Sequence, residues 1–120
     1  LSYTTFRFSD ITLNRSSIGM DNELVASVTV TNTGDRAGSE VVQLYIRDLV
    51  GSVTRPVKEL KGFEKIYLQP NESRTVRFTI APEMLKFYNA DLKFVAEPGD
   101  FDVMIGPDSR NVKTARFTLH

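Results

Sequence analysis

The sequence contains no cysteine and no tryptophan, and its single histidine is the last residue, His120. The lack of cysteine excludes disulfides, thiolate nucleophiles and zinc sites built on cysteine. A Ser-His-acid catalytic site and a histidine-based metal site are excluded too, because the only imidazole lies where chain ends fray. We therefore expect no catalytic residue and no cofactor in this chain, and we assign no function to His120.

The sequence also lacks an excess of charge and a long apolar run. Fifteen basic and fifteen acidic side chains cancel, so no general electrostatic field attracts nucleic acid. No apolar stretch approaches the roughly 18 residues that a membrane-spanning helix needs, so we expect no membrane partner. At 120 residues the chain is predicted to be one domain, residues 1–120. It begins with Leu1 and has no signal segment, so we expect it to be excised from a larger protein.

Two alternating apolar and polar runs between Leu24 and Asp48 are the strongest strand signal. Side chains alternate across a strand, so every second residue shares a face. The residues predicted to face the core are Leu24, Ala26, Val28 and Val30 in the first run and Val42, Leu44 and Ile46 in the second. The connection around Asn32 to Gly34 is predicted to cross from one sheet to the other.

Further strands are predicted on both sides of this pair. The extended segments are 1–13, 58–68, 73–80, 86–88, 93–96, 101–105 and 114–119, with one helical turn at 81–85. About seven to nine short strands with frequent turns are typical of an all-β antiparallel sandwich of fibronectin type III-like or immunoglobulin-like topology. Without a cysteine pair or tryptophan the antibody version is excluded.

Three local features are predicted from breaks in the pattern. The apolar phase changes after Phe8, which indicates a bulge or kink near Ser9 and Asp10. Gly62 marks a second bulge, which would return Phe63 to the core side. Residues 14–22 are polar and are predicted to be a turn.

Carboxylates provide two candidate sites. A cluster in EPGDFD is a candidate calcium site, because Ca²⁺ binds oxygen ligands; its members are Glu97, Asp100 and Asp102. The alternative is a solvated turn with Asp102 on the outer face of the following strand. A glycosidase acid–base pair needs two carboxyls about 5 to 9.5 Å apart across a cleft. We interpret the remaining candidates as ordinary surface charge; they are Asp48, Glu59 and Glu64.

Two tyrosines are the available platforms for saccharide rings, which stack on flat aromatic side chains. They are Tyr45, between Gln43 and Arg47 on an outward face, and Tyr67. The interpretation that we favour for both is cross-strand packing or burial against another domain, because tyrosine is common at interfaces.

The segment Thr54 to Glu59 combines ionic and apolar side chains. Arg55, Lys58 and Glu59 lie beside Pro56 and its valine neighbours. This mixture suits docking onto a neighbouring domain, and a solvated crossover is the alternative. Both interpretations remain open at this point.

Five stretches together resemble the C-terminal fibronectin type III-like domain of family 3 glycoside hydrolases, the β-glucosidase and β-xylosidase group. They are LSYTTF (1–6), VTVTNTGDRAGSEVVQLYIRD (28–48), GSVTRPVKELKGFEK (51–65), LQPNESRTVRFTI (68–80) and EPGDFDVMIG (97–106). The match covers nearly the whole chain. The combination with RPVKELKGFEK, in this order and at these distances, is highly specific.

The resemblance implies a non-catalytic accessory module that braces the catalytic domains of a bacterial periplasmic or secreted β-glucosidase. The nucleophile's Ser-Asp-Trp motif cannot lie here, because the chain has no tryptophan. The expected partners are the catalytic domains of the same polypeptide, or a dimer mate of the parent. The expected contact residues are Tyr3, Tyr45, Arg47, Arg55, Pro56, Lys58 and Glu59. The alternatives are a carbohydrate-binding module, with Tyr45 or Tyr67 as the platform, and an adhesive surface domain.

Overall fold

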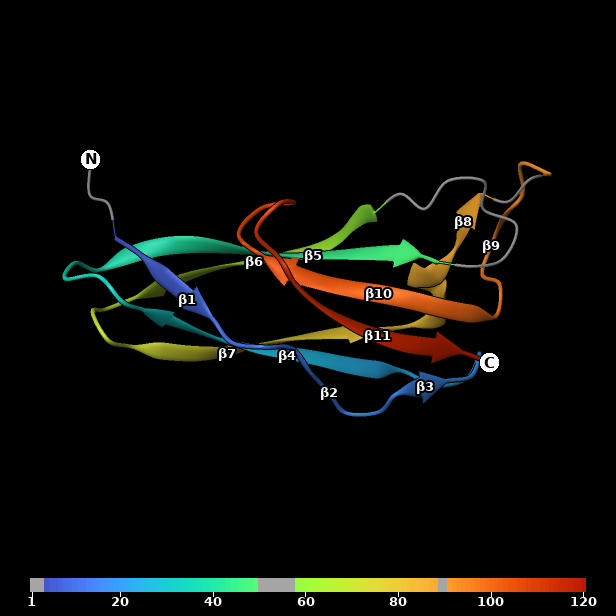
Figure 1. Ribbon diagram of the computed structural model, residues 1–120, viewed down its shortest axis with the longest axis horizontal. Coiled ribbons are helices and arrows are strands. Elements are labelled where there is room, and N and C mark those ends of the chain that lie inside the picture. Colours follow the sequence, from blue (N-terminus) through green and yellow to red (C-terminus); the bar gives the residue numbers. More distant parts are fainter. Residues whose placement is uncertain (1–3, 50–57, 89–90) are drawn as a thin grey trace.

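The computed structural model describes residues 4–49, 58–88 and 91–120 and is all-β (Figure 1). Its strands are β1 (Phe6–Phe8), β2 (Thr12–Leu13), β3 (Ser17–Ile18), β4 (Leu24–Asn32), β5 (Gly38–Asp48), β6 (Lys58–Leu68), β7 (Ser73–Ile80), β8 (Phe87–Tyr88), β9 (Phe94–Val95), β10 (Gly99–Gly106) and β11 (Lys113–Leu119). A single 3-10 turn, η1 (Pro82–Leu85), is the predicted helical turn. Within these ranges no helix is long and apolar enough to cross a bilayer.

Two sheets pack face to face, as predicted for an antiparallel sandwich. In the four-stranded sheet, β4 pairs with β1 and β2 along one side and with β7 along the other. The five-stranded sheet has the order β3-β11-β10-β5-β6, and its β3–β11 pair is parallel. β8 and β9 form a separate hairpin. The described strands number eleven, more than the predicted seven to nine, because four of them have only two residues: β2, β3, β8 and β9.

The two strongest predicted strands, β4 and β5, lie in different sheets, so their connection crosses the sandwich as predicted. Their inward side chains alternate as the pattern indicated, and each of them is at most 2% exposed. Strands β10 and β11 contribute Phe101 and Phe117, whose rings stack with centroids 5.6 Å apart. Burial of such apolar faces contributes most of the stability of a domain without disulfides.

The crossing is fixed by one buried amide, Asn32, at the end of β4. Its Oδ1 accepts hydrogen bonds from Thr4 Oγ1 at 2.7 Å and Gly34 N at 3.0 Å. Its Nδ2 donates to the carbonyl oxygens of Arg36 at 2.7 Å and Leu68 at 3.1 Å. The Asn32 side chain therefore joins the segment before β1, the crossing loop and the end of β6. It links the four-stranded sheet, which contains β1, to the five-stranded sheet, which contains β6.

The irregularity after β1 is confirmed, and Ser9 explains it. The Ser9 amide donates to the Thr29 carbonyl at 2.9 Å, and the Ser9 hydroxyl accepts from the Thr29 amide at 2.8 Å. A side chain thus replaces a main-chain partner between β1 and β2. The prediction of a plain turn at 14–22 was wrong in part, because β3 lies within it and Ile18 is fully buried. Only two residues pair there, which is too short for a periodic signal.

The bulge in β6 is present, but its predicted effect on Phe63 was wrong. Leu44 pairs with Gly62 and Tyr45 with Leu60, so Lys61 is the extra residue. The bulge therefore lies before Gly62 and turns Leu60 outward, while Phe63 is 69% exposed. Gly62 faces the core, where a Cβ would lie 3.7 Å from the Phe78 ring. The ring of Phe78 takes the space that the prediction gave to Phe63.

Removing the buried amide should destabilise the whole domain. Asn32→Ala leaves two carbonyls and one amide without their buried partner, so we expect the free energy of unfolding to fall by about 3 kcal/mol or more. Asn32→Asp should cost as much, because it directs a carboxylate oxygen at the carbonyls of Arg36 and Leu68. Urea unfolding of the isolated chain measures both. The control Asn22→Ala removes an exposed turn amide and should cost less than about 1 kcal/mol; equal costs at the two positions would contradict the role of Asn32.

Candidate functional site

The outer face of the four-stranded sheet carries mainly hydroxyl groups, with Arg7 and Arg77 among them. Thr29 and Thr75 are linked through their Oγ1 atoms at 3.3 Å, and Thr31 and Ser73 through their hydroxyls at 2.7 Å. These pairs lie opposite each other on β4 and β7. Among the described residues, none of the large apolar side chains that are exposed belongs to these two strands. This face is suited to contact with water.

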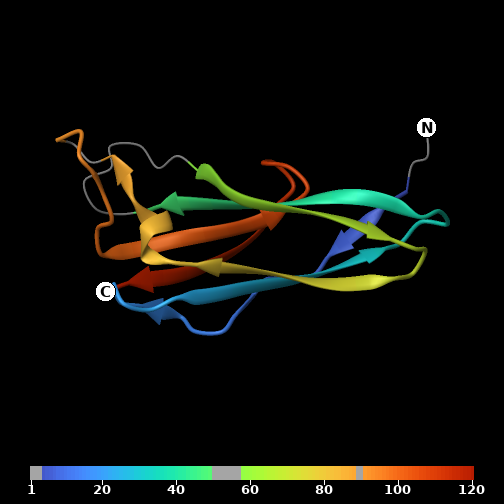
Figure 2. The ribbon, with the colours of Figure 1, turned by 180° about the vertical axis from the view of Figure 1, so that it is seen from behind.

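The exposed apolar side chains lie elsewhere, on β6, on the β8–β9 hairpin and in the loop before β4. They are Leu60, Phe63, Tyr67, Tyr88, Leu92, Phe94 and Met20. The β8–β9 hairpin and the turn between β10 and β11 both rise on the outer side of the five-stranded sheet (Figures 1 and 2). We call this outer side, together with the β8–β9 hairpin, the candidate docking face.

Strand register arranges the centre of this face in rows. One row runs across four strands and consists of Lys58, Arg47, Asp102 and Arg116; we call it the charged row. The next row consists of Leu60, Tyr45, Met104 and Thr114; we call it the apolar row. Charged and apolar side chains therefore lie side by side on this face.

Asp102 lies on the outer face as predicted, but it is buried instead of solvated, with 5% of its surface exposed. Arg116 Nε donates to its Oδ1 at 3.2 Å, and Arg47 Nη2 donates to its Oδ2 at 3.4 Å. Asp100 accepts a hydrogen bond from the Thr118 hydroxyl at 2.8 Å. The described residues contain no group of three metal-binding side chains, so the calcium interpretation of this cluster was wrong. Both oxygens of Asp102 bind arginines.

Tyr45 is half-buried and is held by neighbours on the same face. Its hydroxyl donates to Gln43 Oε1, and Lys58 Nζ lies 6.0 Å from the centre of its ring. Gln43 Nε2 donates to the Pro107 carbonyl at 3.1 Å, and Lys58 Nζ donates to the Ser109 carbonyl. The turn between β10 and β11 is therefore fastened to β5 and β6.

Asp108 organises this turn. Its Oδ1 accepts hydrogen bonds from the amides of Arg110 and Asn111, both at 2.8 Å, and the Asn111 side chain donates to both carboxylate oxygens. These bonds, those from Asn111 foremost, hold the pKa of Asp108 below its usual value. The ionised carboxylate is the form that fixes the turn.

The two tyrosines considered as sugar platforms do not meet. Tyr45 lies opposite Leu60, whereas Tyr67 lies seven positions further along β6, opposite Ser39. At about 3.3 Å per residue the two rings are on the order of 20 Å apart. Tyr67 is 55% exposed. One saccharide ring cannot stack on both, and each remains at most a separate platform.

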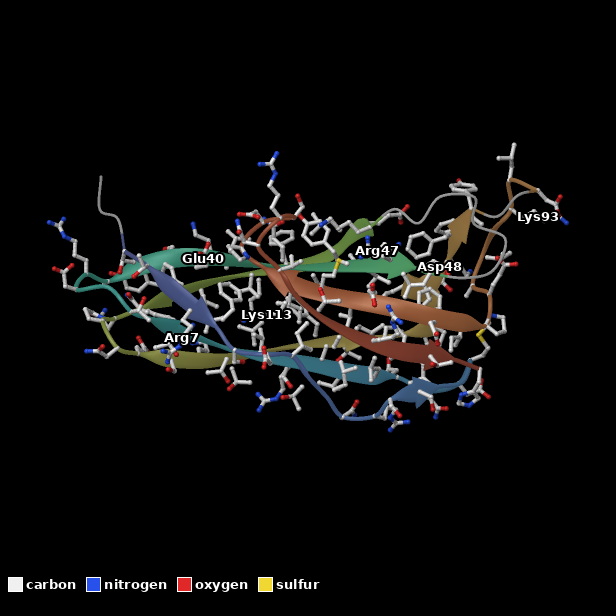
Figure 3. The ribbon with its side chains drawn as sticks, in the orientation of Figure 1. Arg7, Glu40, Arg47, Asp48, Lys93 and Lys113 are labelled. Atoms are coloured by element: carbon white, nitrogen blue, oxygen red, sulfur yellow. The ribbon has the colours of Figure 1, made fainter. Side chains whose placement is uncertain are left out.

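The predicted contact residues fall into two groups. Tyr3, Arg55 and Pro56 lie outside the described residues. The structure brings Tyr45, Arg47 and Lys58 together in two adjacent rows of the candidate docking face, with Arg47 near the end of β5 (Figure 3).

Glu59, the other predicted contact, forms an ion pair with Lys61 at 3.0 Å. The carboxylates weighed as a glycosidase pair do not share a cleft. Asp48 is buried at the end of β5, so its interpretation as surface charge was wrong. Glu59 and Glu64 are exposed on β6, as that interpretation predicted. None of them lines the hollows that border Met20 and Pro82.

The β8–β9 hairpin is the part of the candidate docking face that sequence reasoning missed. Tyr88 pairs with Phe94 across the hairpin, and their ring centres are 5.1 Å apart. Leu92 is 81% exposed. A hollow of about 560 Å³ is lined by Met20, Ala81, Pro82, Glu83, Lys86, Phe94, Val95 and Ala96. The available signal was the sequence FYNADLKF, which places aromatic residues on both sides of a turn.

Three comparisons relate the chain to known proteins. Residues 40–109 match the model of the fibronectin type III-like domain. The chain is 54% identical over 119 residues to a periplasmic β-glucosidase of Salmonella typhimurium and 51% identical over 119 residues to a putative β-xylosidase of Formosa agariphila. Each alignment covers 99% of this chain and 16% of the relative. The chain thus spans about one sixth of these relatives.

Solved structures agree with these sequence relatives. A β-glucosidase from Erythrobacter marinus superposes with a TM-score of 0.91 at 48% identity, covering 100% of this chain and 16% of that chain. A β-glucosidase from Listeria innocua superposes with a TM-score of 0.88 at 39% identity, covering 99% and 16%. The chain is therefore similar to the matching part of these proteins in sequence as well as in fold.

Glu40, near the start of β5 (Figure 3), should make stability depend on pH. Burial raises its pKa above the usual value; the bond from the Val41 amide partly opposes this and Asp108 adds to it. The folded state therefore binds the carboxyl proton of Glu40 more tightly than the unfolded state does. The free energy of unfolding falls as the pH rises from about 4.3, the pKa of a free glutamate, through the raised pKa of the folded state. We expect Glu40→Gln to raise the melting temperature at pH 7 and to have little effect at pH 3.5. A larger gain at pH 3.5 than at pH 7, or a loss at pH 7, would contradict this, with Glu64→Gln as the exposed control.

Proposed function

The chain belongs to the fibronectin type III-like domain family, and from this we propose that it is a non-catalytic accessory module of a β-glucosidase. In this proposal the parent hydrolyses terminal non-reducing β-D-glucosyl residues, and the module braces its catalytic domains. The observation that carries the bracing role is the contrast between the two outer faces. One face carries mainly hydroxyl groups, and the other carries Leu60, Phe63 and the β8–β9 hairpin.

The parent assignment is supported by the names and lengths of the relatives. They are β-glucosidases and β-xylosidases, and the chain aligns with about one sixth of each. A domain of this size that accompanies a much longer enzyme is suited to a supporting role. The word periplasmic in the name of one relative supports a periplasmic or secreted parent.

The bracing role is supported by the cost of leaving apolar side chains in water. Exposing a large apolar side chain instead of burying it costs about 1.5 to 3 kcal/mol. Leu60 is 52% exposed, Phe63 69% and Tyr88 64%. Clusters of such side chains on one side of a small domain mark interaction surfaces. The expected partner is the catalytic part of the same polypeptide.

The non-catalytic role is supported by how the carboxylates are used. Asp102 binds two arginines, Glu59 pairs with Lys61, and Asp108 fixes a turn. A glycosidase needs two carboxyls across a cleft, one of them free to transfer a proton. These three carboxylates are instead engaged by side chains and amides of this chain.

Deleting the module from the intact parent should weaken the enzyme. We expect a melting temperature lower by several degrees, or a lower yield of soluble protein, because the catalytic domains lose a packed neighbour. Scanning calorimetry of the intact and truncated proteins measures this. As a matched pair within the intact parent, Phe63→Ser should lower the melting temperature, whereas Thr29→Ser on the hydroxyl face should not. Unchanged stability and activity after truncation would rule out bracing.

The isolated chain should have no hydrolase activity. We expect the purified 120-residue chain to leave an aryl β-glucoside intact at a protein concentration at which the parent converts it fully. The measurement is release of the coloured aryl alcohol, with the parent as the positive control. Turnover that copurifies with the isolated chain, and that Asp102→Asn abolishes, would contradict a non-catalytic role.

A further inference from the structure

The charged row carries more positive charge than the sheet itself needs. Its register aligns Lys58, Arg47 and Arg116 with a single carboxylate, Asp102. Lys58 and Arg47 are direct cross-strand partners, and like charges in that position destabilise a sheet. Lys58 turns away from Arg47 toward the Ser109 carbonyl and the Tyr45 ring. Within the row three cations accompany one anion, an excess of two positive charges.

Asp102 holds the arginines in place and leaves one of them available. The carboxylate is buried, whereas the side chain of Arg116 is 62% exposed and that of Arg47 is 35% exposed. Within the described part of the chain, Arg47 Nε is buried and lacks a hydrogen-bond partner. An arginine whose side chain is already held by Asp102 loses less conformational entropy when it binds a second partner. Its planar fork suits a second carboxylate.

We propose that the charged row is a recognition site for an acidic segment of the catalytic part of the same polypeptide, with Arg116 as the central contact. This inference rests on the proposed function and specifies the chemistry of the docking partner. The partner places carboxylates on the charged row and apolar side chains on the adjacent apolar row. Arginine and tyrosine are enriched at the centres of protein interfaces, and Arg116 and Tyr45 supply them here.

The neighbouring residues favour a protein partner over a polyanion. Leu60, 52% exposed, and Tyr45 occupy the row beside the arginines. A nucleic acid backbone would need a continuous basic surface, whereas the chain as a whole has a net charge of zero. A patch with a few fixed cations beside apolar side chains instead selects a protein surface of complementary charge.

The ion pairs of Asp102 with Arg47 and Arg116 also link β5, β10 and β11. The test must therefore separate docking from the stability of the isolated chain. Arg116→Gln removes the exposed fork and leaves Asp102 paired with Arg47. Lys65→Gln is the matched control, because Lys65 is an exposed cation on the same face, opposite Val41 and outside the charged row. Both variants are made in the isolated chain and in the intact polypeptide.

Hydroxyl-radical labelling of Leu60 and Phe63 reports docking at the level of side chains. We expect these residues to be labelled at least about fivefold more slowly in the intact polypeptide than in the isolated chain. On heating, their labelling should rise to the isolated-chain rate at an undocking temperature. Arg116→Gln and 0.5 M salt should each lower this temperature by about 5 °C or more, whereas Lys65→Gln should shift it by less than half as much.

The outcomes distinguish the two proposals. Equal labelling in the intact polypeptide and the isolated chain would mean that this face does not dock, which overturns the charged-row inference and the docking face. Protection that neither Arg116→Gln nor salt weakens would overturn only the charged-row inference. If Arg116→Gln lowers the melting temperature of the isolated chain and the undocking temperature equally, the ion pairs of Asp102 only hold the strands together. That result would overturn the charged-row inference. Protection of Leu60 in the isolated chain that grows with its concentration would identify a second copy as the occupant and overturn the inference.

Discussion

The fold depends on the buried side chain of Asn32, which satisfies all of its hydrogen-bonding groups where the chain crosses between sheets. A crossing loop cannot form a ladder, so its buried main-chain groups need side-chain partners. An amide can donate to two carbonyls and accept two bonds at once, which a carboxylate or hydroxyl cannot do. Gly34 is required beside it, because a Cβ there would meet Thr4 Oγ1 at 2.0 Å. The amide thus fixes how the two sheets face each other.

With the sheets fixed, strand register determines what each outer face presents. β10 lies in the middle of the five-stranded sheet and is buried on both sides, with Phe101 and Val103 toward the core and Asp102 and Met104 outward. The outer side of the five-stranded sheet is therefore partly shielded from water along β10. The fastened turn between β10 and β11 and the β8–β9 hairpin rise on that same side (Figure 2). Most of the exposed apolar side chains of the described residues thus lie on β6 and on the β8–β9 hairpin.

Periodicity was sufficient to predict the long strands, because their alternating residues are set by burial on one face. The bounds of β7 and the inward residues of β4, β5 and β11 follow from the pattern. The pattern could not predict β3, which pairs over only two residues, or the side on which Phe63 lies, because a bulge one residue earlier reverses it. That Tyr45, Arg47 and Lys58 contact another domain remains a prediction. The row that aligns Arg47 and Lys58 with Arg116 exists only through cross-strand register. The exposed apolar residues of the β8–β9 hairpin depend on packing that the sequence does not encode locally.

The central claim is that this module docks through the outer side of its five-stranded sheet. A solved structure of the intact parent polypeptide tests this most directly. We predict that Leu60, Tyr45 and Arg116 are buried against the catalytic part, and that a carboxylate of the catalytic part lies within hydrogen-bond distance of Arg116. We also predict that the hydroxyl face of β4 and β7 remains in water. A structure in which the hydroxyl face is the one covered, or in which the charged row remains open to solvent, would contradict it.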